Sequence, residues 1–172
     1  PDDEVPQPQS KEDAENVLRA YVGSKELRER STHKAQRRIW AEHTYTHRAM
    51  KIMDSVEAKY TNPLRESISV VASTNRPQHL NRIIDTHARQ IHPNRELILV
   101  AHGFEVPGNL YQRATDAGIE SIQVIEADSS QTLGACLNMG VAAAGGSIIA
   151  KMDDDDIYGA HYLSDLVESL RY

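Results

Sequence analysis

The sequence contains no hydrophobic run long enough to cross a membrane and no signal-type segment at its start. Its longest apolar stretches, such as Gly140–Ala150, fall well short of the roughly 20 residues that span a bilayer, and glycines interrupt them. The first residues, Pro1–Pro6, are acidic and rich in proline, whereas a signal peptide is basic and then apolar. We therefore expect no transmembrane helix, and we expect residues 1–9 to form a disordered lead.

Cysteine is nearly absent, since Cys136 is the only one in 172 residues. A single cysteine cannot form an internal disulfide, so nothing requires an oxidising compartment, and we expect a cytoplasmic protein. The formal net charge of −6 disfavours a nucleic-acid partner, because phosphate neutralisation needs clustered Lys and Arg. The segment Lys25–Arg48 is locally basic, and a solvated helix face accounts for it better than nucleic-acid or membrane binding does.

Residues 10–63 are predicted to form an α-helical segment. Ser10 is placed to cap a first helix, in which apolar residues recur at helical spacing until Gly23 ends it. Ser24 can cap a second helix, whose apolar spacing continues until Asn62-Pro63. A helical pair this short buries too little apolar surface to be stable alone, so its apolar stripe needs a partner surface.

The pattern changes at Ser67, where short β-branched runs begin to alternate with helical patterns. This alternation is typical of βαβ units, and it predicts an α/β fold over residues 64–172 with a Rossmann-like, mostly parallel four-stranded sheet. Right-handed crossovers place the carboxyl ends of parallel strands along one edge, where open α/β sheets bind ligands. The predicted strands are Ile68–Ala72, Glu96–Ala101, Ser121–Glu126 and Ser147–Met152, and the predicted helices lie near Gln78–Gln90, Gly108–Ala117, Thr132–Ala144 and Ala160–Leu170.

Four consecutive aspartates, Asp153–Asp156, directly follow the last predicted strand. Like charges this close repel one another unless a counter-ion binds, and a hard divalent cation with oxygen ligands is the natural one. Because side chains alternate along an extended segment, Asp153 and Asp155 can point the same way while Asp154 points to the other face. The alternative is a solvated acidic turn that caps the helix near Ala160. We favour the metal site.

Five stretches of the second half occur in the order and spacing of the family 2 glycosyltransferases, and the resemblance covers roughly residues 66–172. It implies the donor-binding half of an incomplete GT-A fold, with a nucleotide-diphosphate sugar as the donor. The five stretches are SISVVASTNRP (67–77), ELILV (96–100), LGACLNMG (133–140), AAGG (143–146) and KMDDDDIY (151–158).

The resemblance also implies roles for individual residues. The turn Ser73–Pro77 matches the family segment that lies against the nucleotide, so Ser73 and Arg76 become donor-site candidates. For Ser73, a capped turn that opens the next helix fits equally well. Asp153 and Asp155 match the two ends of the family's Asp-x-Asp motif, which holds Mg²⁺ or Mn²⁺ on the donor diphosphate. In the same match, Asp154 faces the ribose and Asp156 supports the metal site.

The sequence departs from the family pattern at two places. After the second strand the family commonly has an acidic residue that reads the base, whereas this chain has Ala101-His102-Gly103-Phe104. His102 could make a different contact through its imidazole, although a loop histidine without a ligand role fits as well. The family's Ala-Arg-Asn becomes Cys136-Leu137-Asn138, which loses a basic residue and leaves Asn138 as a donor-site candidate.

The helical segment carries a second resemblance. Residues 30–48 (RSTHKAQRRIWAEHTYTHR) are similar to the C-terminal end of spore-maturation-type glycosyltransferases, which have a GT-B-like fold. This similarity implies a parent protein with two glycosyltransferase modules, of which this chain spans the junction. His43 and His47 lie at i and i+4, but no glutamate accompanies them as in a zinc-protease helix, so we expect surface or packing histidines.

The preferred function is sugar transfer from a nucleotide-diphosphate donor, assisted by Mn²⁺ or Mg²⁺. The resemblance places the catalytic base beyond Tyr172, so we expect the 172-residue chain to bind donor without transferring the sugar. A nucleotidyl transferase would have a glycine-rich phosphate loop after the first strand, and Ser73–Pro77 contains no glycine. A non-catalytic nucleotide-binding or interaction module is the alternative function.

Overall fold

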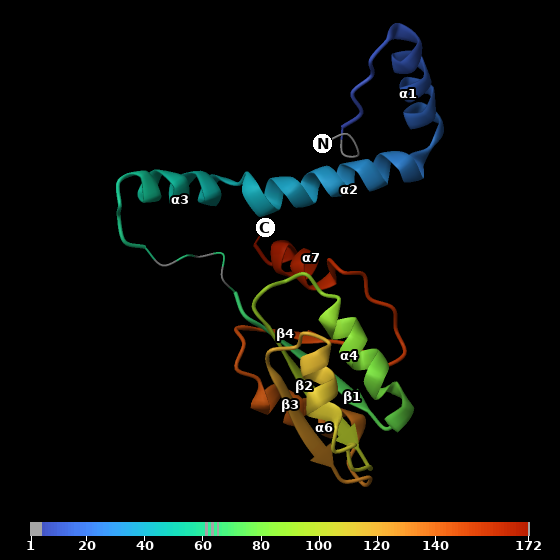
Figure 1. The fold of residues 1–172 in the computed structure, drawn as a ribbon, viewed down its shortest axis with the longest axis vertical. Coiled ribbons are helices and arrows are strands. Elements are labelled where there is room, and N and C mark those ends of the chain that lie inside the picture. The colour runs from blue at the N-terminus through green and yellow to red at the C-terminus, as the bar shows by residue number, and fades with distance from the viewer. Residues whose placement is uncertain (1–4, 61, 63, 65, 172) are drawn as a thin grey trace. The chain divides into compact units, whose positions relative to one another are not determined.

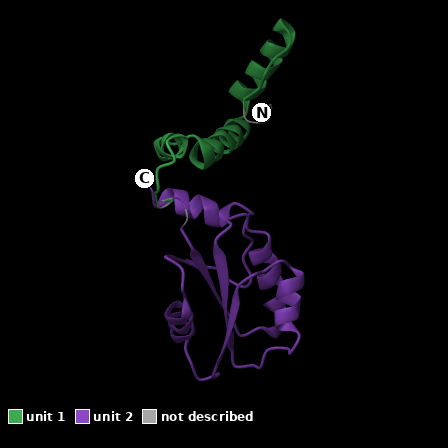
Figure 2. Cartoon of the chain, turned by 60° about the vertical axis from the view of Figure 1, so that its left-hand side comes forward, with its two compact units in different colours: residues 1–62 green, residues 63–172 purple. Residues whose placement is uncertain are grey.

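The computed structural model describes residues 5–60, 62, 64 and 66–171, and the chain divides into two compact units. The first unit comprises residues 1–62 and the second comprises residues 63–172, as Figure 2 shows by colour. The expected disordered lead falls partly on residues 1–4, and the expected helix stop falls partly on Pro63. Residues 1–4 and Pro63 lie outside the described residues.

The first unit contains three helices, α1 (Lys11–Gly23), α2 (Lys25–Glu42) and α3 (Tyr45–Ser55), which Figure 1 labels. Serine side chains cap α1 and α2 as predicted, because Ser10 Oγ accepts from the Asp13 amide and Ser24 Oγ from the Leu27 amide, both at 3.1 Å. The prediction of one helix from Ser24 to about residue 60 was wrong. The chain leaves helical geometry at His43, and Thr44 caps a new helix through the His47 amide.

The first unit has almost no core of its own. Among its described residues only Ser31 is buried, where its hydroxyl lies 2.7 Å from the Tyr21 hydroxyl between α1 and α2. The apolar stripes of the helices remain exposed, with Val22 at 79% and Ile52 at 64%. The described part of the unit thus buries little apolar surface, and the expectation that these helices are not stable alone stays a prediction.

The second unit is a four-stranded, wholly parallel sheet in the order β3-β2-β1-β4. The Rossmann-like prediction is confirmed, and each predicted strand and helix is present with small shifts at its ends. In register, Val70 of β1 lies between Leu97 of β2 and Ala150 of β4. The elements are β1 (Ile68–Thr74), η1 (Pro77–His79), α4 (Leu80–Ala88), β2 (Arg95–His102), α5 (Leu110–Asp116), β3 (Ile122–Ala127), α6 (Leu133–Ala143), β4 (Ile148–Lys151) and α7 (Tyr162–Ser169).

Helices cover both faces of this sheet (Figure 2). On one face, strand residues such as Val70 and Leu97 pack with α4, α5 and α7 into the main core. On the other face α6 packs through Cys136 against Val100. The four carboxyl ends of the parallel strands therefore lie along one edge, and the aspartates that follow β4 belong to that edge.

Two expectations from composition can be compared with the structure. Cys136 is a free, buried thiol, as a single cysteine requires. Across residues 5–60, 62, 64 and 66–171, none of the helices combines the length and the apolar character needed to span a membrane.

Gly140 allows α6 to approach the sheet closely, and this generates a stability prediction. A Cβ at Gly140 would lie 2.5 Å from Val71 Cγ1, a methyl group of a fully buried strand residue. Gly140→Ala should therefore lower the free energy of unfolding by about 1–3 kcal/mol, because overpacking exceeds the gain in helix propensity. Urea denaturation of the 172-residue chain measures this.

Gly134 of the same helix is the matched control, because a Cβ there meets nothing closer than Thr132 Oγ1 at 4.0 Å. Gly134→Ala should leave stability unchanged or raise it by up to about 1 kcal/mol. Equal effects of the two substitutions would show that helix propensity, and not close approach, governs Gly140.

Candidate functional site

A buried aspartate joins the turn after β1 to the aspartates after β4. The Asp154 side chain is 6% exposed, and its two oxygens accept from Arg76 Nε at 2.9 Å, from Arg76 Nη2 and from Thr74 Oγ1. Arg76 thus forms a two-pronged pair with a carboxylate that is 78 residues away in sequence. The neighbouring parallel strands β1 and β4 bring the two segments together.

The predicted alternation of side chains along the aspartate segment is only partly met, because Asp154 and Asp155 both contact Arg76 Nη2. Asp154 is buried, whereas Asp153 and Asp155 remain 43% and 55% exposed. The two exposed carboxylates nevertheless have different cationic partners. Lys151 Nζ contacts both oxygens of Asp153 at 2.5 and 2.6 Å, and Arg76 Nη2 lies 3.0 Å from Asp155 Oδ2. Each of these carboxylates therefore has a positive charge beside it.

Tyr158 and Arg82 hold the backbone of the same segment. The Tyr158 hydroxyl accepts from the Asp153 amide at 2.8 Å and donates to Asp156 Oδ2 at 3.4 Å. Burial raises the pKa of Tyr158, and the carboxylates of Asp153 and Asp156 raise it further, so the hydroxyl keeps its proton. Arg82 of α4 donates to the carbonyl oxygens of Asp155 and Asp156 at 2.5 and 2.9 Å.

Sequence reasoning missed several residues of this edge. A lysine and a tyrosine next to an acidic run are a usable signal for Lys151 and Tyr158, because oppositely charged and hydroxyl groups pair with carboxylates. No local signal identifies Arg82, which acts from a helix, or His79, whose Nδ1 lies 3.3 Å from Asp154 Oδ2 without hydrogen-bond alignment. Thr74 has the turn role that was considered for Ser73, since Thr74 Oγ1 accepts from the Arg76 amide at 3.0 Å.

The remaining donor-site candidates lie in different surroundings. Ser73 Oγ is buried at the end of β1 and has no hydrogen-bond partner among the described residues. His102 ends β2, and its Nε2 lies 3.3 Å from the Ser129 carbonyl oxygen. Asn138 is exposed on α6, whose neighbouring Gly140 is buried against the sheet. The structure therefore shows a Ser73 hydroxyl without a hydrogen-bond partner among the described residues, and a hydrogen-bond partner for the His102 imidazole.

The aspartates fit a divalent cation only with help from other ligands. Within the part of the chain that the structure describes, no three His, Cys, Asp or Glu residues are grouped so as to hold a metal ion. Asp153 and Asp155 could supply two carboxylates, which are hard oxygen ligands. Mg²⁺ typically uses one or two protein carboxylates together with phosphate oxygens and water, so this pair suits a metal that arrives with a diphosphate.

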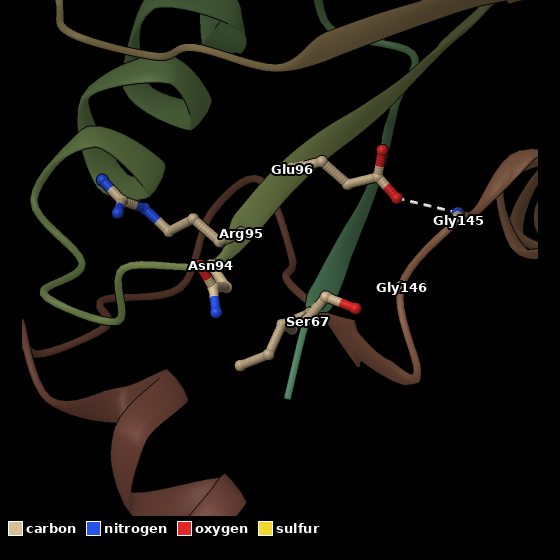
Figure 3. A pocket seen from close by; sticks show the side chains of 7 residues that line it. Ser67, Asn94, Arg95, Glu96, Gly145 and Gly146 are labelled. Carbon is tan, nitrogen blue, oxygen red and sulfur yellow. Dashed lines mark hydrogen bonds between the residues drawn. The ribbon is translucent and has the colours of Figure 1, made fainter. Parts of the chain in front are cut away.

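A hollow of about 370 Å³ lies at the opposite edge of the sheet from the aspartates (Figure 3). Its carboxylate, Glu96, is already engaged, because Glu96 Oε1 accepts from Ser69 Oγ and from the Gly145 amide. The bond from Ser69 lowers the pKa of Glu96, as do the backbone amides of Gly145 and Gly146. Gly146 is required here, since a Cβ would lie 2.7 Å from the Ser69 nitrogen. The residues at this edge therefore have a structural role, and the candidate ligand-binding residues lie at the carboxyl edge of the sheet.

Asp154 generates a prediction about stability and pH. Burial opposes its ionisation, but hydrogen bonds from Thr74 and Arg76 and the charge of Arg76 outweigh burial and hold the pKa of Asp154 below its usual value. Such a carboxylate stabilises the fold above its unfolded-state pKa of about 4 and loses this effect as pH falls through the folded-state value. Asp154→Asn should therefore lower the free energy of unfolding by about 1–3 kcal/mol at pH 7.

The difference between wild type and Asp154→Asn should shrink as the pH is lowered below about 4, where the wild-type carboxyl takes up a proton. Chemical denaturation across pH 3 to 7 measures it. Asp116→Asn is the control, because Asp116 is an exposed residue of α5 that accepts one bond from Gln112. An Asp154→Asn chain as stable as wild type at pH 7 would contradict the anchoring role of Asp154.

Comparisons with known proteins agree with the fold of the second unit. An uncharacterized glycosyltransferase from Nostoc sp. is 32% identical over 107 residues, which cover 59% of this chain and 32% of that protein. Among solved structures, S. aureus TarS 1–349 matches with a TM-score of 0.51 at 18% identity, covering 61% of this chain and 32% of that one. The mannosyltransferase PcManGT from Pyrobaculum calidifontis, in complex with GDP-Man and Mn²⁺, matches with a TM-score of 0.52 at 18% identity.

The PcManGT match covers 74% of this chain and 39% of that chain, and at this identity both structural likenesses show the fold alone. The chain thus spans well under half of the length of each of these relatives. A family model described as Glycosyl transferase-like matches residues 1–54. A model described as Glycosyl transferase family 2 matches residues 69–172, which is more than half of the chain, and the chain therefore belongs to glycosyl transferase family 2.

Proposed function

We propose that the second unit binds a nucleotide-diphosphate sugar together with Mn²⁺ or Mg²⁺ at the carboxyl edge of its sheet. One observation carries the proposal: the aspartates after β4 are tied through Asp154 to the turn after β1, so both segments face one site. The carboxylates of Asp153 and Asp155 and the guanidinium of Arg76 are then available to one ligand. A diphosphate that brings a divalent cation matches this mixture of charges.

The surroundings of each residue indicate its proposed role in binding the metal or the donor. Asp153 and Asp155 are the proposed metal ligands because they match the two ends of the Asp-x-Asp motif and are both solvent-accessible, and the exposed Asp156 supports them through Tyr158. Ser73 and Arg76 are proposed to contact the donor. Both oxygens of Asp154 are engaged by Thr74 and Arg76, so we assign Asp154 the positioning of Arg76 in place of the expected ribose contact.

The proposed reaction is transfer of a hexosyl group from the donor to an acceptor hydroxyl. The bound metal, when present, neutralises charge on the leaving diphosphate. We assign the general base to sequence beyond Tyr172, so the 172-residue chain should bind donor without forming the glycoside. We also propose that the protein is cytoplasmic and that it binds no nucleic acid.

A non-catalytic nucleotide-binding or interaction module is the second candidate. It is favoured by the loss of the acidic base contact, since His102 occupies that position and already lies near the Ser129 carbonyl oxygen. The two candidates differ in metal dependence, because a module that only binds a partner protein needs neither nucleotide nor metal.

Calorimetric titration with nucleoside diphosphates tests the metal site directly. The diphosphate should bind more tightly with Mn²⁺ than without it, and Asp155→Ala should remove most of that gain, because a carboxylate ligand is lost. Asp116→Ala is the control and should keep the gain, since Asp116 lies on α5 away from the aspartate segment in sequence. Binding that is independent of metal, and unchanged in Asp155→Ala, would reject the proposed metal site.

His102 provides a separate test of the base pocket. If its imidazole contacts the base, His102→Ala should weaken nucleotide binding by about three- to tenfold, the size of one net hydrogen bond. Affinity for Mn²⁺ should stay the same, because His102 is not a proposed ligand. Nucleotide affinity equal to that of wild type would assign His102 only its packing role beside Ser129.

A further inference from the structure

Lys151 is the last residue of β4 and directly precedes the aspartate segment. Its ammonium contacts both oxygens of Asp153, at 2.5 and 2.6 Å, from a side chain that is itself 48% exposed. Lys151 and Asp153 are two positions apart at the end of an extended strand, so their side chains can lie on the same side. The ammonium therefore occupies the face of Asp153 that a cation would use.

The two cations at this edge are held very differently. Arg76 is fixed by three oxygens, two from the buried Asp154 and one from Asp155. Among the described residues the Lys151 ammonium forms hydrogen bonds with Asp153 only, through a flexible four-carbon stem with three rotatable donors. An exposed ion pair of this kind is weak, so a competing divalent cation can displace the ammonium at little cost. Arg76 stays in place while Lys151 can move.

We propose that Lys151 is an exchangeable counter-ion, which holds Asp153 in the metal-free protein and turns to the donor diphosphate when a divalent cation takes its place. This inference rests on the proposed function and goes beyond it by naming a residue that serves the two ligands in opposite ways. Lys151 competes with the metal for one carboxylate. Once displaced, it adds a positive charge for the phosphate oxygens, which an ammonium binds as a point charge.

The proposal makes two predictions of opposite sign for Lys151→Gln. Mn²⁺ alone should bind about two- to fivefold more tightly, because its competitor at Asp153 is gone. A nucleoside diphosphate, added in saturating Mn²⁺, should bind about five- to tenfold more weakly, because one charge-assisted contact is lost. A side chain with only a structural role would not move the two affinities in opposite directions.

Titrations of the 172-residue chain with Mn²⁺, followed by the relaxation rate of water protons, measure the first affinity, and calorimetry with a nucleoside diphosphate measures the second. Lys151→Arg retains the charge and should restore both affinities toward those of wild type. Arg113→Gln is the control for a simple change of net charge, because Arg113 pairs with Asp85 between α5 and α4 and contacts none of the four aspartates. Circular dichroism checks that each variant is folded.

Tighter Mn²⁺ binding together with weaker diphosphate binding in Lys151→Gln alone supports the exchange. An unchanged or lower Mn²⁺ affinity overturns the competition, and an unchanged diphosphate affinity overturns the transfer of Lys151 to the donor. A wild-type chain that binds no Mn²⁺, with or without nucleotide, is a different result. It contradicts the proposed function itself.

Discussion

The pair between Arg76 and Asp154 is the interaction on which the rest of this edge depends. It joins the turn after β1 to the segment after β4, and the Thr74 hydroxyl adds a third bond to the same carboxylate. A buried carboxylate is unfavourable unless it is paired and hydrogen-bonded, and Asp154 has both kinds of partner. Asp154 is buried, whereas its neighbours Asp153 and Asp155 remain partly exposed to solvent.

The same arrangement gives each of the four consecutive aspartates a partner within the chain. Lys151 faces Asp153, Arg76 faces Asp154 and Asp155, and the Tyr158 hydroxyl approaches Asp156. The repulsion within the segment is thus reduced locally, and the segment keeps one backbone path with the help of Arg82. A ligand that brings its own cation and its own negative charges can exchange these partners without building a new site.

Much of the sheet was predictable because strand and helix periods differ, and β-branched runs such as Ile68–Val71 and Ile148–Ile149 mark the strands. The aspartate segment was predictable for the same reason, since it follows directly from the end of a strand. The break at His43 was not, because Thr44 is a poor marker of a cap when helical spacing continues on both sides of it.

The partners within the site were the hardest part to predict from sequence. Arg76 and Asp154 are distant along the chain, and the register between β1 and β4 decides that they meet. The choice between Ser73 and Thr74 as the hydroxyl that bonds the Arg76 amide in the turn also follows from which side of β1 each one faces, because adjacent strand residues point to opposite faces. Family resemblance identified the segment, whereas the pairing inside it came from the structure.

The proposed function depends on a metal ion and a nucleoside diphosphate binding together at the carboxyl edge of the sheet in the second unit. Paramagnetic broadening by Mn²⁺ of the backbone amide resonances, recorded with a nucleoside diphosphate, locates the ion without any substitution. Broadening should be strongest at Asp153–Asp156 and extend to Thr74–Arg76, while the amide resonances of Glu96 and Gly145 at the opposite edge should stay sharp. Broadening centred on Glu96 and Gly145, or none at all, would contradict it.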